Sequence, residues 1–112
     1  MAFSEIEIAS IKSAMDAYIL RIRPQPEIRD KLDISYKIYG QSVEIFEIRP
    51  DMNRKIMHNP IAKTTYIRTD STWKIFWMRA DLKWHGYKIQ SVKTINIFIE
   101  IVDTDEFCCF WG

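Results

Sequence analysis

The stretch LDISYKIYGQSVEIFEIRP, residues 32–50, decides the fold. From Leu32 to Ile38 apolar and polar side chains alternate, which is the period-two pattern of a half-buried strand. Gly40-Gln41 fits a two-residue type II′ turn, because glycine accepts the positive φ needed at the first central position. From Ser42 to Arg49 apolar residues occur on both parities, as in a central strand or one with a bulge. The stretch therefore predicts an antiparallel hairpin.

Helices are predicted at both ends of the chain. Ser4 and Glu7 form a capping-box pair, and apolar residues then recur at three- and four-residue steps until Pro24 ends the helix. Near the other end, Ser91 is the predicted cap of a closing helix, with a buried side of Val92, Ile95, Phe98 or Ile99, and Val102. The tail FCCFWG is too apolar to stay in solvent, so we expect it to pack onto the body, with a short extra strand as one form.

A second hairpin is predicted between these elements. Residues 62–69 favour a third strand, residues 70–72 a turn, and Trp73 begins an aromatic fourth strand. Residues 50–60 are expected to form a long polar loop. If the fourth strand stays extended, alternation predicts a core face of Phe76, Met78, Ala80, Leu82 and Trp84 and an outer face of Trp73, Ile75, Trp77, Arg79, Asp81, Lys83 and His85. Alternatively, residues 81–87 already form a turn.

The predicted fold class is α+β. The N-terminal helix and the C-terminal helix pack together on one face of a four-stranded antiparallel sheet that consists of two hairpins. The composition, 47% hydrophobic and 28% charged over 112 residues, is that of one domain spanning residues 1–112. Nineteen isoleucines exclude a disordered chain.

Cellular location is inferred from the cysteines and the termini. Adjacent Cys108 and Cys109 form no disulfide framework and indicate a reducing compartment. Glu5 and Glu7 stand where a secretory signal carries basic residues, and no stretch approaches the roughly 20 apolar residues of a membrane helix. We expect a complete small cytoplasmic protein with no membrane partner, no metal and no other cofactor.

The net charge of +1 conceals a basic segment, because residues 61–93 carry seven Lys and Arg against two Asp. Aromatic residues interleave with these cations, as on surfaces that bind single-stranded nucleic acid. The commoner alternative is that the rings are core and the cations are solvated. We favour a binding or interaction module over an enzyme. In the nucleic-acid hypothesis, phosphate contacts come from Lys63, Arg68, Arg79 and Lys83, stacking comes from Trp77 and Tyr87, and further ligand-binding candidates are Arg49 and His85.

Two alternatives remain open. A metal-dependent nuclease-like enzyme would use Glu44 or Glu47 with Asp81 and Lys83, since carboxylates from separate strands beside a lysine can hold Mg²⁺ and stabilise a phosphoryl transition state. Against it, Glu44 and Glu47 share a face only if a bulge intervenes, and an ion-paired sheet surface is the default. The other alternative is a homodimer formed through an exposed sheet face or edge, because the aromatic content exceeds what one small core needs.

Three stretches carry a resemblance to a known family: VEIFEIRP (43–50), IAKTTYIR (61–68) and TWKIFWMRADLKWHGY (72–87). They resemble an uncharacterised bacterial family, domain of unknown function 3024. Its most specific part is the W-x-R-x-D-x-K-W-H run from Trp77 to His85, and the likeness extends from about Pro24 to the closing Phe-Trp-Gly. The resemblance implies a small stand-alone bacterial protein. It brings no known activity and therefore no catalytic or binding residues.

Overall fold

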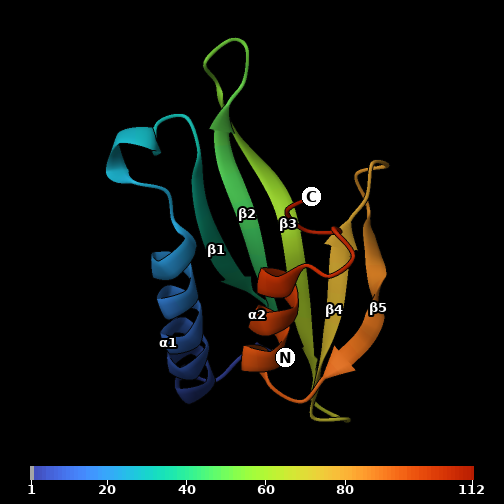
Figure 1. The fold of residues 1–112 in the computed structure, drawn as a ribbon. Helices are drawn as coiled ribbons and strands as arrows, with labels where there is room; N and C mark the ends of the chain where they lie inside the picture. Colours follow the sequence, from blue (N-terminus) through green and yellow to red (C-terminus); the bar gives the residue numbers. More distant parts are fainter. Residues whose placement is uncertain (1) are drawn as a thin grey trace.

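A computed structural model describes residues 2–112 (Figure 1). The elements in chain order are α1 (Glu5–Ile22), a 3-10 turn η1 (Pro26–Ile28), β1 (Asp33–Tyr39), β2 (Ser42–Pro50), β3 (Ile56–Ile67), β4 (Thr72–Met78), β5 (Trp84–Val92) and α2 (Ile95–Thr104). All neighbouring strands are antiparallel, in the sheet order β1-β2-β3-β4-β5. Both α-helices lie on the same face of the sheet (Figure 1), which confirms the α+β prediction.

The sheet has five strands instead of the predicted four. The fourth strand ends at Met78, and a tight turn leads into β5. Leu82 takes a positive φ of 62° there, and the Asp81 carboxylate accepts a hydrogen bond from the Lys83 backbone N–H at 3.0 Å. The alternative prediction of a turn is thus confirmed for residues 81–83, whereas residues 84–87 belong to a strand. An aspartate that bonds backbone N–H groups just after it favours a turn over an extended strand.

Two other turns test the hairpin predictions. Gly40 has a φ of +55°, as the predicted Gly-Gln turn requires. The long loop expected over residues 50–60 is wrong, because residues 56–60 belong to β3. Asp51 shortens the connection by accepting hydrogen bonds from the backbone N–H groups of Asn53 and Lys55, at 2.8 and 2.9 Å. The β2–β3 hairpin consequently projects beyond the other strands (Figure 1).

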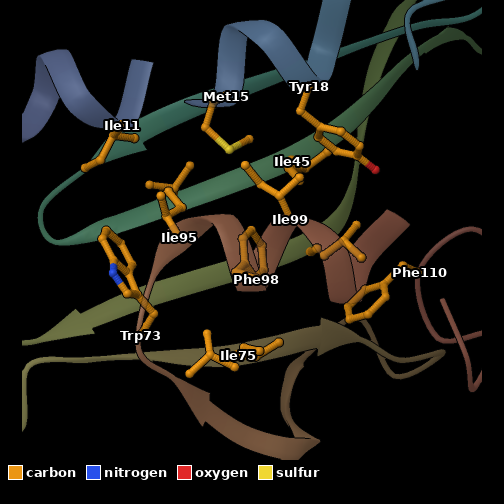
Figure 2. Close-up of a cluster of buried hydrophobic side chains, with 14 of the residues drawn as sticks. Ile11, Met15, Tyr18, Ile45, Trp73, Ile75, Ile95, Phe98, Ile99 and Phe110 are labelled. Carbon is orange, nitrogen blue, oxygen red and sulfur yellow. The ribbon is translucent and has the colours of Figure 1, made fainter. Parts of the chain in front are cut away.

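The core lies between the two helices and one face of the sheet (Figure 2). The predicted capping box is present at Ser4 and Glu7, and α1 contributes the fully buried Met15. From α2 comes Phe98, and the sheet supplies Ile45 and Ile75, all three fully buried. Burying such side chains stabilises a domain by about 1.5–3 kcal/mol each, so this layer is what holds the helices on the sheet.

The predicted assignment of faces on the fourth strand is wrong. Trp73, Ile75 and, partly buried, Trp77 pack into the core, so Phe76 and Met78 point to the opposite face. The prediction assumes a strand as far as Trp84, in which the charged residues after Met78 make the parity of Trp73 polar. Within β4 itself, Thr72 and Lys74 mark the opposite face as the polar one. The ring of Trp73 stacks on Phe3 at 5.7 Å between centroids, a partner that only the helical face of the sheet can provide. Tertiary packing decided which set was buried.

The closing helix begins later than predicted. Its cap is Thr94, whose hydroxyl accepts from the Ile97 backbone N–H at 3.2 Å, while Ser91 and Val92 lie in β5. The tail packs onto the body as expected, but as an irregular segment without a strand. The Asp105 carboxylate holds it by accepting from three successive backbone N–H groups, those of Phe110, Trp111 and Gly112, at 3.0, 2.8 and 3.2 Å. Phe110 is buried as a result.

Candidate functional site

The sheet face away from the helices, here called the outer face, carries a row of side chains that crosses all five strands. Direct cross-strand pairs join Lys37 to Glu44, Glu44 to Lys63, Lys63 to Phe76, and Phe76 to Gly86. Phe46 and the Met78–Trp84 pair flank this row. Because directly opposed residues share one face, the row is continuous. This face combines rings with lysines, and no helix covers it (Figure 1).

The lysines of the outer face lie over its rings. Lys63 Nζ is 5.1 Å from the ring centroid of Phe76 and 5.3 Å from that of Trp84. Lys74 Nζ is 5.9 Å from Phe76, and Lys37 Nζ is 5.8 Å from Phe46. Ammonium groups within about 6 Å of a ring centroid are attracted by the ring quadrupole. The cations are therefore held close to the aromatic surface, on which Phe76 and Trp84 are partly exposed.

The one carboxylate in the row, Glu44, is already occupied. It is 6% exposed, accepts a hydrogen bond from the Tyr39 hydroxyl at 3.0 Å, and pairs with Lys37 at 3.5 Å. Burial and then the bond to Glu44 raise the pKa of Tyr39 to about 12, so Tyr39 remains a proton donor. Within residues 2–112, Lys63 and Lys74 form no salt bridge with a carboxylate. The outer face thus presents an excess of positive charge.

Gly86 leaves the outer face open beside Phe76. It sits directly opposite Phe76 on β5, and a Cβ atom built at this glycine has no heavy atom within 4 Å. Its φ is not in the left-handed region, so the backbone does not require glycine here. Because glycine has no side chain, there is open space next to the Phe76 ring, at the β5 position two residues after Trp84.

A second cluster forms where β4 turns into β5 and meets the C-terminal tail. The guanidinium of Arg79 lies 5.4 Å from the Trp77 ring centroid, and His85 Nε2 is 2.8 Å from Asp81 Oδ2. That hydrogen bond lowers the pKa of Asp81. Trp77, Arg79, His85 and Tyr87 all line one hollow of about 500 Å³. Four candidates from the sequence therefore converge, although Tyr87 is 3% exposed and belongs mainly to the core, which corrects its assignment as a surface stacking ring.

The remaining sequence candidates lie apart. Arg49 pairs with Glu47 at 3.3 Å on the β2–β3 hairpin, and Arg68 forms two hydrogen bonds with the Glu7 carboxylate, at 2.9 and 3.0 Å. Lys83 is exposed in the β4–β5 turn. Over residues 2–112, no three His, Cys, Asp or Glu side chains are placed to share a metal ion. The three acids of the nuclease hypothesis instead occupy three separate pairs, Glu44 with Lys37, Glu47 with Arg49 and Asp81 with His85.

The Cys109 thiol also lines the hollow beside β4 and β5. Its sulfur donates to the Phe107 carbonyl oxygen at 3.7 Å, and burial is the main cause that raises its pKa. A nucleophilic cysteine needs a lowered pKa, because the thiolate is the reactive form. Cys109 is therefore a neutral packing group in this hollow, and its proximity to His85 does not make a catalytic pair.

Sequence reasoning missed the outer-face residues Lys37, Phe46, Lys74, Phe76 and Trp84. The parity of Leu32 to Ile38 did place Lys37 on the polar face of its strand. Phe76 and Trp84 were assigned to the core, because one unbroken strand was expected, with the charged residues after Met78 marking the other parity as solvent-facing. Phe46 is opposite Pro60 with a register shift beside it, which agrees with the bulge that the apolar residues on both parities of this strand allowed, but the pattern did not locate the shift at Phe46.

The fold and the two clusters define a small α+β protein with a meandering antiparallel sheet, covered by helices on one face only. The model of the family described as Domain of unknown function (DUF3024) matches residues 3–112, and the chain belongs to this family. No curated protein and no solved structure gives a significant match. Among residues 2–112 no helix is long and apolar enough to cross a membrane.

Proposed function

We propose that this protein is a binding module for single-stranded nucleic acid and that the outer face is its binding surface. The observation that carries the proposal is the pair of short distances from Lys63 to the rings of Phe76 and Trp84. Single-stranded nucleic acid needs cations for its phosphates and flat apolar rings for its bases, at a spacing of one nucleotide or so. Lys63, Lys74 and the adjoining rings offer both on an uncovered sheet.

The surface is suited to unpaired strands more than to a duplex. Base stacking requires rings that bases can reach, and Phe76 lies beside the open space at Gly86. A duplex hides the faces of its bases, so a protein would then contact mainly the phosphates. Phosphate contacts by Lys63 and Lys74, the two lysines without a salt bridge, predict a slope of about −1.4 in log K against log salt for a single strand.

The proposal revises the sequence hypothesis in two respects. Of the predicted phosphate contacts, Lys63 stays, while Arg68 is engaged by Glu7 on the helical side of the molecule. The stacking rings become Phe76 and Trp84 in place of Trp77 and Tyr87, because Phe46 is buried against His58. The free thiols of Cys108 and Cys109 support a reducing, cytoplasmic location, where such a partner is available.

Fluorescence anisotropy with a labelled thymidine oligonucleotide of about 12 nucleotides, within the usual site sizes, tests the proposal. We expect binding that weakens with salt. Lys63→Gln should make the slope of log K against log salt less negative by about 0.7. Phe76→Ala should weaken binding by roughly 5- to 150-fold, the equivalent of 1–3 kcal/mol per stacked base. The matched control is Lys12→Gln, which removes the same charge from the exposed side of α1.

A third variant fills the open space instead of removing a group. Gly86→Val is expected to fold, because its backbone is unstrained and valine favours strands. Its side chain occupies the space beside Phe76, so oligonucleotide affinity should fall although every charge remains. Absence of binding at low salt, or equal affinity for the wild type and both Lys63→Gln and Phe76→Ala, would show that the outer face is not a nucleic-acid surface.

A further inference from the structure

The hollow between the β4–β5 turn and the C-terminal tail has the features of a small-molecule site. Its volume of about 500 Å³ lies within the usual range of ligand pockets, roughly 300–1,000 Å³. Trp77 on β4 and Phe107 on the tail supply aromatic walls, and Arg79, His85 and Lys88 supply nitrogen donors. It lies on the side of the sheet where the tail packs, and it borders the outer face at Gly86, which lines both.

Two cations of the hollow are without a carboxylate partner. Over residues 2–112, neither Arg79 nor Lys88 forms a salt bridge. Arg79 lies across the Trp77 ring, and Lys88 Nζ is 4.6 Å from the Phe107 ring centroid. Each cation is thus held against one wall by its ring, with its remaining N–H donors available to an anion.

Two of the acids nearby keep their negative charge but bind other groups than Arg79 and Lys88. The hydrogen bond between His85 Nε2 and the Asp81 carboxylate, at 2.8 Å, orients the imidazole. His85 Nδ1 takes no part in that bond. The Asp105 carboxylate is occupied by three backbone N–H groups of the tail. Glu106 is exposed beside the start of the tail. An anion that enters the hollow therefore meets one guanidinium, one ammonium and one imidazole.

We infer that this hollow binds a phosphorylated aromatic small molecule, of which a nucleoside monophosphate is the representative. The phosphate would lie against Arg79 and Lys88, because guanidinium groups bind phosphate through two parallel hydrogen bonds and ammonium groups through charge. The flat ring would pack between the walls made by Trp77 and Phe107, where offset stacking adds about 0.5–1.5 kcal/mol beyond burial. The inference does not rest on the proposed function of the outer face.

Titration with adenosine monophosphate, followed by two-dimensional NMR, tests this site in the full-length protein. We expect saturable shifts of the Trp77 indole N–H and of the backbone N–H groups of residues 85–88 and 107–109. Adenosine and inorganic phosphate, which each carry one half of the ligand, should bind at least about tenfold more weakly, because each uses one set of contacts.

Variants separate this site from the outer face. Arg79→Gln and Lys88→Gln should each weaken adenosine monophosphate binding about tenfold, whereas Lys63→Gln on the outer face should leave it unchanged. The oligonucleotide assay should show the reverse pattern, so the two proposals can fail independently. Shifts that do not saturate, shifts at other residues only, or equal affinity in Arg79→Gln and the wild type would overturn the inference.

Discussion

The strongest single prediction concerns Asp105, which attaches the C-terminal tail. Asp105 is the C-cap residue of α2, and its carboxylate accepts hydrogen bonds from the backbone N–H groups of Phe110, Trp111 and Gly112. Asp105 has a φ of 48°, in the left-handed region that aspartate tolerates better than most residues. Asp105→Ala removes all three bonds and places a less tolerant residue at this φ. We expect the tail to detach from the body.

The magnitude follows from what the detached tail no longer buries. Hydrogen bonds to a charged acceptor contribute about 1.5–3 kcal/mol each, but three bonds to one partly exposed carboxylate do not add in full. When the tail detaches, the loss in the free energy of unfolding cannot exceed what packing of the tail on the body contributes to it. Burial of Phe110, whose ring is 5.0 Å from that of Tyr87, sets that contribution at about 2 kcal/mol. Asp105→Asn keeps one acceptor oxygen and should lose about half as much.

Urea unfolding monitored by tryptophan fluorescence measures the change, and hydrogen exchange of the backbone N–H groups of residues 110–112 reports on the tail alone. Asp105→Gly is the control, because it accepts the left-handed φ and yet lacks the carboxylate. If the carboxylate matters, the glycine variant is destabilised like the alanine variant. A loss under about 0.5 kcal/mol for Asp105→Ala, with unchanged exchange at residues 110–112, would refute the reasoning.

Two further predictions concern pH and the core. The hydrogen bond from Arg68 is the main cause that lowers the pKa of Glu7 from 4.5 to about 2, so the stability that this pair adds is present above pH 4.5 and is lost as the pH falls through 2. Carboxyl NMR titration should find the Glu7 pKa near 2 in the wild type and clearly higher in Arg68→Gln, though still below 4.5 because the Ser4 backbone N–H keeps its bond to Glu7; the same pKa in both would contradict the pairing. Phe98→Ala removes a fully buried ring from the centre of α2 and should destabilise the protein by about 3–5 kcal/mol in urea unfolding, whereas the exposed Ile97→Ala should cost under about 1 kcal/mol.

The N-terminal helix and the first hairpin were predictable because their signals are local. The capping box at Ser4 and Glu7 involves residues three apart, and the turn at Gly40 depends on the φ of one residue. Period-two alternation from Leu32 to Ile38 likewise requires no knowledge of distant partners. The family resemblance was also carried by contiguous stretches, and it is confirmed over residues 3–112.

The candidate sites were predictable only in part. Asp81 and His85 were singled out from one short run, and the turn between them brings their side chains to 2.8 Å. Lys63 lies on the outer face, but its ring partners were assigned to the core. The hollow also needs Phe107 from the tail, and no local pattern connects the tail with the β4–β5 turn.

The sequence by itself determined the class of fold, the helix start and the first hairpin, because neighbouring residues decide capping, turns and alternation. Tertiary structure decided which face of β4 is buried. Both faces of that strand carry aromatic rings, and the choice is fixed where Trp73 and Ile75 meet Phe3 and the helices. The same packing leaves Phe76 on the solvent side with Lys63 above it. Burial is a property of the assembled layers, and for this strand it determined which rings are available to a ligand.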